Sequence, residues 1–182
     1  MDDFSFPYRR VVVVGATGCG KSTLAENLAQ RLGLDYIELD ALYWKPGWVG
    51  SAEEEFRAKV EAATRSLGWA LAGNYRVVRD IVWPRAEAVI WLDYPFLLIL
   101  GRLLGRIWLR WRRKELLWGT NYEPLWVHFK FWSDDSLVKW LFKTYWRRKR
   151  EYPALFARPE YAHLKVLHFK KPGEMEAWFE TL

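Results

Sequence analysis

The sequence has little of what disulfide scaffolds and metal centres are made from. Its 182 residues include one cysteine, Cys19, and three histidines. One cysteine excludes a disulfide scaffold and a cysteine-rich zinc site, and three histidines leave little material for any metal centre. Because 51% of the residues are hydrophobic and 27% are charged, the composition also excludes a disordered or fibrous chain. A chain of this length predicts one domain with a substantial core.

Long uninterrupted apolar runs are also missing. The most apolar stretch, from Tyr94 to Trp111, is broken by three arginines, whereas a membrane-spanning helix needs about 20 mostly apolar residues. The first seven residues contain two aspartates and lack the basic start of a signal peptide. We therefore expect no transmembrane segment, no integral membrane association and a cytoplasmic location.

Acidic residues are scarce in one segment. The net charge of the chain is +6, but between Arg102 and Arg150 there are 13 lysines and arginines against four acidic residues. Seven of the 13 tryptophans fall in the same segment. Such an excess of positive charge predicts an anionic partner, which could be the phosphates of a small molecule, a nucleic acid or a lipid surface.

What the sequence does contain is an alternation of strand and helix patterns. The β-branched run Val11 to Val14 is typical of a central parallel strand buried on both faces. Further strands are predicted at residues 36–39, 69–72, 88–92 and 166–169, and helices at 24–32, at 53–67, after Pro95 and after Gly173. This alternation predicts a three-layer α/β fold with a mostly parallel five-stranded sheet. About 70 residues separate the last two strands, so we expect a helical insert at about 100–150 within a single domain of residues 1–182.

A complete phosphate-loop pattern follows the first strand. The pattern G-x-x-x-x-G-K-[ST] is met by Gly15, Gly20, Lys21 and Ser22. Glycines permit backbone conformations in which consecutive N–H groups point at phosphate oxygens, and the following helix adds the positive end of its dipole. We expect Lys21 to reach the β- and γ-phosphates of ATP as a catalytic residue, and the Ser22 hydroxyl to bind Mg²⁺. The residues expected to bind the nucleotide are Gly15, Ala16, Thr17, Gly18, Cys19, Gly20, Lys21, Ser22 and Thr23.

Each of three predicted strands has a polar residue at its carboxyl end. Ligands of open α/β sheets bind beyond the carboxyl ends of the strands, where the sequence places Asp40, Asn74 and Asp93. We expect Asp40 to act in catalysis by orienting an acceptor hydroxyl, or to hold Mg²⁺ through water, and Asn74 and Tyr75 to contact the acceptor. Asp93 is either a more distant acid of the site or, as we favour, a cap of the helix that follows it.

Arginines supply the positive charge that phosphoryl transfer needs around the moving group. Arg79 and Arg85 are either clamps for an anionic acceptor or surface charges. In the insert, arginines recur at every fourth position from residue 102 to 110, and a second cluster includes Arg147 and Arg148. We expect a mobile basic lid whose arginines, Arg147 and Arg148 among them, act catalytically as it closes. The alternative is a solvated charged face.

The same insert suggests two other functions. An ATPase could engage nucleic acid through the basic segment and its interleaved aromatics, although we find no recognised nucleic-acid motif. Attachment to a membrane surface through residues 95–114, a basic amphipathic stretch, is the third and least favoured interpretation. We favour an ATP-dependent phosphotransferase that acts on a small molecule or nucleotide.

Several longer motifs are shared with a known group of proteins. They are Leu39-Asp40-Ala41-Leu42-Tyr43-Trp44-Lys45-Pro46-Gly47-Trp48, Gly73-Asn74-Tyr75, Arg79-Asp80, Trp83-Pro84-Arg85, Trp91-Leu92-Asp93 and Leu117-Trp118-Gly119-Thr120-Asn121. With the phosphate loop, they make nearly the whole chain resemble the adenylate-kinase-related P-loop proteins, many of which carry the label topology modulation protein. The phosphate loop is a superfamily motif, whereas the first two of these motifs together are much more specific.

This resemblance implies a nucleoside-monophosphate-kinase-like core with sheet order 2-3-1-4-5, a helical lid, and binding of ATP with Mg²⁺; it names no acceptor. One position departs from the group. Relatives often have Asp before Gly-Asn-Tyr, where a Walker B acid would lie, and this chain has Ala72. The departure implies either that Asp40 or Asp93 holds the water shell of Mg²⁺, or that the enzyme is slow.

Overall fold

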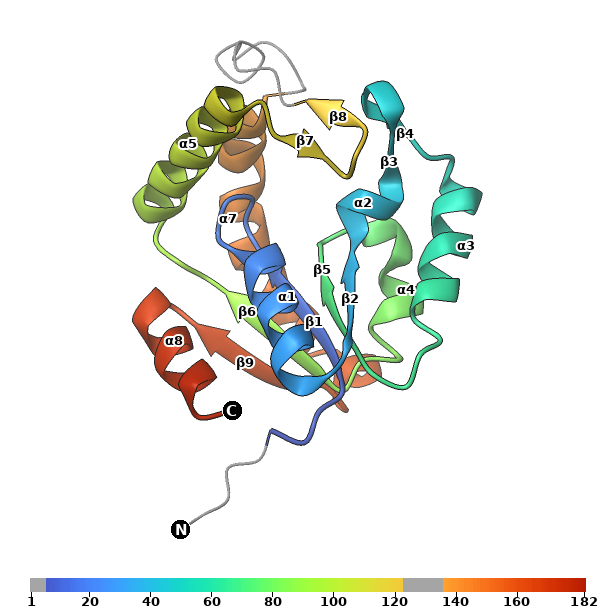
Figure 1. Ribbon diagram of the computed structural model, residues 1–182. Coiled ribbons are helices and arrows are strands. Elements are labelled where there is room, and N and C mark those ends of the chain that lie inside the picture. The colour runs from blue at the N-terminus through green and yellow to red at the C-terminus, as the bar shows by residue number, and fades with distance from the viewer. Residues whose placement is uncertain (1–5, 123–135) are drawn as a thin grey trace.

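A five-stranded parallel sheet forms the centre of the protein (Figure 1). The computed structural model describes residues 6–122 and 136–182. The strands of the sheet are β1 (Arg10–Gly15), β2 (Asp35–Glu38), β5 (Trp69–Ala72), β6 (Ala88–Leu92) and β9 (Lys165–Phe169). Their order in the sheet is β2-β5-β1-β6-β9, and all four pairings are parallel. This confirms the predicted order 2-3-1-4-5.

Helices cover both faces of the sheet, which confirms the three-layer α/β prediction. One face is covered by α1 (Lys21–Leu32), α5 (Phe96–Arg113) and α8 (Pro172–Glu180), and the other by α3 (Glu53–Ala63) and α4 (Arg79–Val82). Helix α7 (Leu137–Phe156) belongs to both layers. Leu141 in its first half is buried with α5, and Leu155 in its second half is buried on the α3 side.

Strand β1 shows why the sequence specifies this arrangement. Val11 and Val13 pack into the cluster beneath α1, and Val12 and Val14 into the cluster beneath α3. Successive side chains of a strand point to opposite faces. A run of four valines, each at most 1% exposed, therefore requires a helical layer on each side. This burial fixes the loop after Gly15 at the middle of the carboxyl edge.

Several short elements depart from the sequence-based predictions. The second strand ends at Glu38 rather than Leu39, because α2 (Leu39–Tyr43) begins there, and α3 ends at Ala63 rather than Leu67. Two small hairpins were not predicted: β3 (Trp44–Lys45) with β4 (Val49–Gly50), and β7 (Leu116–Leu117) with β8 (Asn121–Tyr122). Strands of two residues are too short to show an alternating pattern. Short 3-10 turns occur at η1 (Pro46–Trp48), η2 (Arg76–Val78) and η3 (Pro159–Tyr161).

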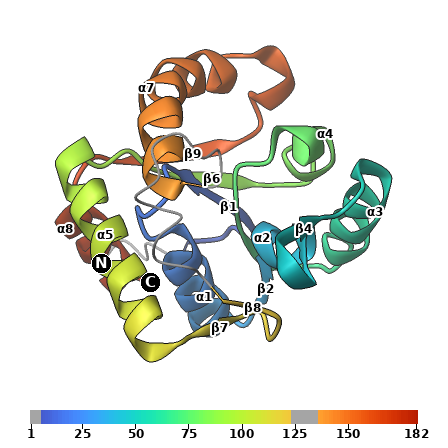
Figure 2. The ribbon, with the colours of Figure 1, turned by 90° about the horizontal axis from the view of Figure 1, so that it is seen from above.

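In its described residues, the segment between β6 and β9 includes α5, the β7–β8 hairpin, α7 and η3. Residues 123–135, which include Trp126 and Trp132, lie outside the described part. Viewed from above, α5 lies on one side of α1, and α2 with β4 lies on the other (Figure 2). The insert thus provides one side of the region above the strands. Its predicted action as a mobile lid stays a prediction.

Gly73 is a position where the backbone requires glycine. Its φ is +148°, and a Cβ there would lie 2.7 Å from the Cβ of Leu39. Gly73→Ala should therefore lower the free energy of unfolding by about 1–3 kcal/mol, because backbone strain and steric overlap act together. Urea denaturation measures this change. Gly173→Ala is the matched control, since a Cβ there meets no atom within 4 Å; equal losses in the two variants would contradict the argument.

Candidate functional site

The phosphate loop lies between β1 and α1 at the carboxyl edge of the sheet. Gly18 and Gly20 have φ angles of +81° and +100°, in the left-handed region that favours glycine. Gly20 immediately precedes α1, so the loop ends at the positive end of that helix dipole. The predicted loop therefore has the backbone features of an anion site.

Lys21 belongs to a cluster of positive charge at this loop. Its Nζ donates a hydrogen bond across the loop to the carbonyl oxygen of Ala16 at 2.9 Å. Burial lowers the pKa of Lys21, and the neighbouring charges of Arg148 and Arg106 lower it further. An anion bound in the loop would offset the repulsion between these cations.

Three arginines of the insert contribute to the cluster. Arg102 and Arg106 lie one turn apart on α5, and the charge of Arg106 acts directly on Lys21. The Nη1 atom of Arg102 lies 3.5 Å from the carbonyl oxygen of Cys19. Arg148 of α7 donates from Nη1 to the carbonyl oxygen of Gly15 at 3.4 Å. The insert thus brings charge from two helices to the loop.

Arg147 does not share this position. Its Nε lies 3.8 Å from Glu151 Oε1, and both side chains are about half exposed. Burial, in contrast, lowers the pKa of Arg148. Adjacent residues of a helix point about 100° apart, so only one of the two can face the loop. The sequence predicted both as lid arginines, and the structure brings Arg148 alone to the loop.

Asn74 holds the start of the phosphate loop. Its Nδ2 donates to the carbonyl oxygen of Gly15 at 2.5 Å, and its Oδ1 accepts from the Gly15 N–H at 3.2 Å. The same Oδ1 accepts from the hydroxyl of Tyr152 at 3.0 Å. Burial raises the pKa of Tyr152 to about 12, so this hydroxyl keeps its proton near neutral pH. Both ends of the Asn74 amide are therefore engaged in positioning the loop, whereas the sequence suggested an acceptor contact.

Glu38 is the site residue that sequence reasoning missed. Its Oε1 accepts a hydrogen bond from the Ser22 hydroxyl at 2.8 Å, and its Oε2 accepts one from the indole N–H of Trp118 at 3.0 Å. The available signal was its place as the last residue of the second strand, which we extended by one residue. With Ala72 in place of an acid, Glu38 is the carboxylate that the structure places on Ser22.

Asp40 lies in the first turn of α2, just beyond the carboxyl end of β2. The hydroxyl of Tyr75 donates to Asp40 Oδ1 at 2.7 Å. Burial, and then the charge of Asp40, raise the pKa of Tyr75, so the phenol remains a hydrogen-bond donor. Asp40 itself is exposed. The structure therefore brings Asp40 and Tyr75 together and leaves the carboxylate accessible.

Asp93 does not cap α5, so the favoured prediction for this residue is wrong. Its Oδ2 lies 3.0 Å from His168 Nε2, and its Oδ1 lies 3.5 Å from Lys149 Nζ. Helix α5 begins after Pro95 without a side-chain cap. The carboxylate instead links the ends of β6 and β9 to α7. These tertiary partners, 56 or more residues away in sequence, took the place of the local capping contact.

Arg79 and Arg85 lie apart from each other. Arg79 begins α4, and its guanidinium lies over the Trp83 ring, 5.0 Å from the centroid. Arg85 precedes β6, at the opposite edge of the sheet from the phosphate loop, and donates to Thr64 Oγ1 at 2.7 Å and to the carbonyl oxygen of Glu61 at 3.1 Å. The structure thus ties Arg85 to the end of α3 and does not bring it to the phosphate loop.

The β7–β8 hairpin of the insert contacts the β3–β4 hairpin. Asn121 of β8 accepts from the backbone N–H of Trp48 at 3.0 Å and donates to the carbonyl oxygen of Lys45 at 3.1 Å. The indole N–H of Trp48 donates to the carbonyl oxygen of Tyr122 at 2.9 Å, and its ring packs edge-on against Trp118. The two unpredicted hairpins therefore meet directly beside Glu38.

Residues 6–122 and 136–182 contain no group of three or more His, Cys, Asp or Glu side chains that could hold a metal ion. Over the same residues, none of the helices combines the length and apolar character needed to cross a membrane.

Comparisons with known proteins agree with this geometry. A model of the ATPase family associated with various cellular activities (AAA) matches residues 11–93. The chain is 34% identical over 131 residues to the shikimate kinase of Geobacter sulfurreducens, which covers 62% of this chain and 68% of that protein. It is 28% identical over 117 residues to the protein YqaC of Bacillus subtilis, covering 63% and 66%. The chain thus spans about two thirds of the length of these curated relatives.

A solved structure extends the likeness over nearly the whole fold. Shikimate kinase from Acinetobacter baumannii in complex with shikimate matches with a TM-score of 0.54 and 18% identity, covering 96% of this chain and 90% of that one. At this identity the match shows the fold: the same α/β arrangement around a parallel sheet.

Proposed function

This chain belongs to the P-loop kinases, and we propose that it transfers the γ-phosphoryl group of ATP to an oxygen atom of a small molecule or nucleotide: a hydroxyl oxygen in the first case, a phosphate oxygen in a nucleoside monophosphate. One observation carries the proposal. A complete phosphate loop and two carboxylates, Glu38 and Asp40, share one edge of the sheet, and Glu38 is hydrogen bonded to Ser22 of the loop. This arrangement supports a nucleotide site and an acceptor site that lie side by side.

The nucleotide phosphates are bound by the loop backbone and Lys21. The left-handed glycines and the start of α1 direct N–H groups at an anion. The ammonium of Lys21, which donates to Ala16 here, turns to the β- and γ-phosphates when they are present. All nine residues of the predicted loop, Gly15 to Thr23, belong to this part of the proposal.

The oxygen atoms of Ser22 and Glu38 fit Mg²⁺. A hydroxyl and a carboxylate are ligands that this hard cation prefers, directly or through water. They lie 2.8 Å apart in a hydrogen bond. When bound, Mg²⁺ would neutralise charge on the β- and γ-phosphates. Glu38 then does what the acid absent at Ala72 does in related proteins.

The transfer itself needs charge stabilisation and one proton acceptor. The bond from the γ-phosphorus to its bridging oxygen breaks, and a bond to the acceptor oxygen forms. Arg148, Arg102 and Lys21 stabilise the charge on the moving group. Asp40 orients the acceptor hydroxyl and takes its proton, and Tyr75 positions Asp40 through the 2.7 Å hydrogen bond.

The finer identity of the acceptor is also part of this proposal. The Geobacter relative is named a shikimate kinase, which favours polyhydroxylated acids. The motifs shared with the nucleoside-monophosphate-kinase-like and topology modulation proteins favour a nucleotide. In either case the insert at about 100–150 acts as a lid within a single domain, and closure brings Arg148 and Arg102 over the phosphates.

The experiment is a screen for ADP release from ATP and Mg²⁺ with shikimate, other polyhydroxylated acids and nucleoside monophosphates. A kinase releases ADP in proportion to added acceptor and yields the phosphorylated acceptor. ADP release that is independent of every acceptor and is stimulated by DNA would contradict the proposal in favour of the nucleic-acid ATPase.

Asp40→Asn should lower kcat by about a hundredfold or more while changing the Kd of ATP by less than about threefold. The amide keeps the shape of the carboxylate but cannot take the acceptor proton, and it lies outside the loop that grips the nucleotide. Steady-state kinetics and calorimetric ATP binding measure the two effects. Asp35→Asn, at an exposed position that begins β2, the strand before α2, is the matched control and should behave as the unaltered protein. Loss of ATP affinity with kcat preserved would reverse the assignment.

A further inference from the structure

Helix α5 has a second apolar face that points away from the core. Its buried face is built around Leu103. On the other side Leu97, Leu104, Trp108 and Trp111 are 79%, 40%, 54% and 44% exposed. Their spacing of seven, four and three residues aligns them along one side of the helix. We call these four residues the outer stripe.

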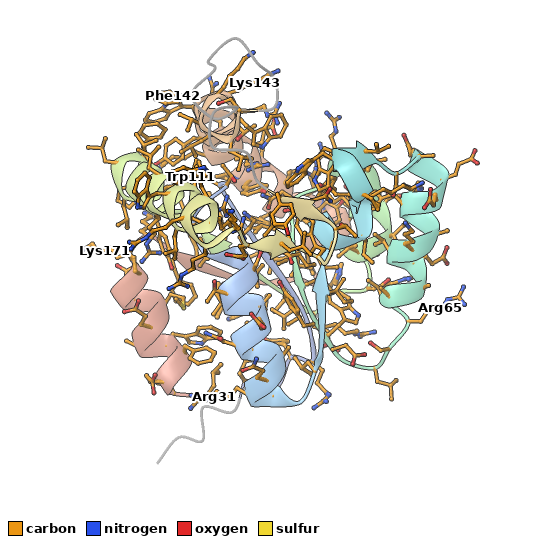
Figure 3. All side chains as sticks on the ribbon, turned by 45° about the horizontal axis from the view of Figure 1, so that its top comes forward. Arg31, Arg65, Trp111, Phe142, Lys143 and Lys171 are labelled. Carbon is orange, nitrogen blue, oxygen red and sulfur yellow. The ribbon has the colours of Figure 1, made fainter. Side chains whose placement is uncertain are left out.

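The apolar surface continues onto α7. Phe142 and Trp146, one turn apart on that helix, are 50% and 57% exposed. Phe96, the residue before Leu97, packs against both, with ring centroids 4.8 Å and 6.4 Å away. Phe142 and Lys143 project from α7 at the top of the molecule, away from the sheet (Figure 3). The two helices therefore present one connected surface.

Exposed apolar side chains are concentrated on these two helices. Among the described residues, 14 large hydrophobic side chains are exposed, and nine of them belong to α5 or α7. Single exposed hydrophobic residues are normal on a protein surface. A cluster of this kind, rimmed by polar residues, marks a binding surface instead.

Positive charge surrounds this surface. Helix α5 contains five arginines and no acidic residue, and α7 contains six lysines and arginines and one acidic residue, Glu151. Three of these cations, Arg102, Arg106 and Arg148, belong to the phosphate-loop cluster and do not count toward this surface. Arg112, Lys143 and Arg150 are exposed beside the apolar side chains. The outer stripe itself carries no charge. Cations therefore flank an apolar line without interrupting it.

We propose that the outer stripe, together with Phe142 and Trp146, docks the protein on an anionic lipid surface. A helix with Trp and Leu on one face and arginines on the other lies in the plane of a bilayer interface, where the apolar side chains enter the acyl boundary and the cations meet the headgroups. On α5 the outer stripe is the apolar face and Arg112 is exposed beside it, and α7 adds two aromatic side chains with Lys143 and Arg150 exposed next to them.

Charge and chemistry favour lipid over two other occupants. A second copy of this chain would bring a strongly basic face against an equally basic one, which repels. The phosphates of a nucleic acid would pair with the cations. They would not bury exposed aliphatic side chains such as Leu97 and Leu104, because a phosphate backbone is charged and hydrated. The headgroups of an anionic lipid pair with the cations, and its acyl chains bury the aliphatic side chains.

Co-sedimentation of the full chain with vesicles tests the proposal. We expect binding to vesicles of phosphatidylcholine with phosphatidylglycerol, and at least about tenfold weaker binding to phosphatidylcholine alone. The double variant Trp108→Ala/Trp111→Ala should weaken binding by about tenfold or more. ATP turnover and thermal unfolding should stay unchanged, because both side chains point away from the phosphate loop. Leu67→Asp is the matched control: Leu67 is 92% exposed but lies after α3, so its replacement should leave vesicle binding intact.

Each other outcome overturns the proposal. Equal binding to neutral and anionic vesicles would show that the cations do not contribute to vesicle binding. Concentration-dependent dimers that the double variant dissociates, without vesicle binding, would assign the surface to a second copy. Salt-sensitive DNA binding that Arg112→Glu abolishes, again without vesicle binding, would assign it to nucleic acid.

Discussion

Replacing Arg148 by alanine is expected to lower kcat for phosphoryl transfer by about a hundredfold or more, whereas Arg147→Ala should leave kcat within about twofold of the unaltered protein. The two residues are adjacent on α7 and carry the same charge. Arg148 is held in the loop by its contact with the Gly15 carbonyl oxygen at 3.4 Å, and Arg147 pairs with Glu151 at the surface. An exposed ion pair such as that of Arg147 with Glu151 contributes little to stability. A preorganised cation beside the moving phosphoryl group stabilises charge that develops in the transition state.

Comparing the two variants distinguishes the effect of an arginine's position on kcat from the effect of the net charge of the insert. Both lower the charge of the insert by one, so an effect that depends only on long-range electrostatics would be the same in each. Steady-state kinetics at saturating ATP and acceptor measure kcat, and thermal unfolding confirms that both variants fold. Similar losses in the two variants would contradict the assignment of Arg148, and a larger loss in Arg147→Ala would reverse it.

Lys21→Ala should abolish measurable turnover, with a loss of about a thousandfold or more in kcat/KM. The ammonium is the charge that the loop itself directs at the β- and γ-phosphates. Lys21→Arg should lose nearly as much, because the guanidinium is larger and planar and Lys21 is surrounded by other cations. Coupled ADP-release assays and ATP titrations measure both variants.

The control for Lys21 is Lys165→Ala, which removes an exposed lysine at the start of β9, at the opposite edge of the sheet. It changes the net charge by the same amount and should leave turnover unchanged. A folded Lys21→Ala protein with full activity would contradict a role of the phosphate loop in turnover.

The central fold and the loop could be predicted because their signals are local. The valines of β1 specify a buried central strand, and the glycines and Lys21 of the loop follow it directly in the chain. Asp40 and Tyr75 were each singled out as polar residues after a strand. In a parallel sheet the carboxyl ends of strands share one edge, and this is why residues 35 positions apart form a hydrogen bond.

The rest of the site depends on contacts that leave no local pattern. Trp118 reaches Glu38 across 80 residues, through a hairpin too short to show periodicity. Helical spacing makes Arg147 and Arg148 point in different directions, but which of the two faces the phosphate loop depends on how α7 packs in the fold, and no local pattern shows this. Asp93 followed the sequence rule for a helix cap, but His168 and Lys149 provided stronger tertiary partners. Local rules failed where long-range packing offered a charged alternative.

The amide of Asn74 makes the nucleotide loop and α7 thermodynamically interdependent. One oxygen atom accepts from both the Gly15 N–H and the Tyr152 hydroxyl, so the two elements share this hydrogen-bond acceptor. Any ligand that displaces α7 and breaks the Tyr152 bond alters the free energy of the loop, and through it the affinity for nucleotide. By reciprocity, nucleotide changes the affinity for that ligand by the same factor. Tyr152→Phe removes the shared bond and should reduce that coupling factor, while each ligand still binds.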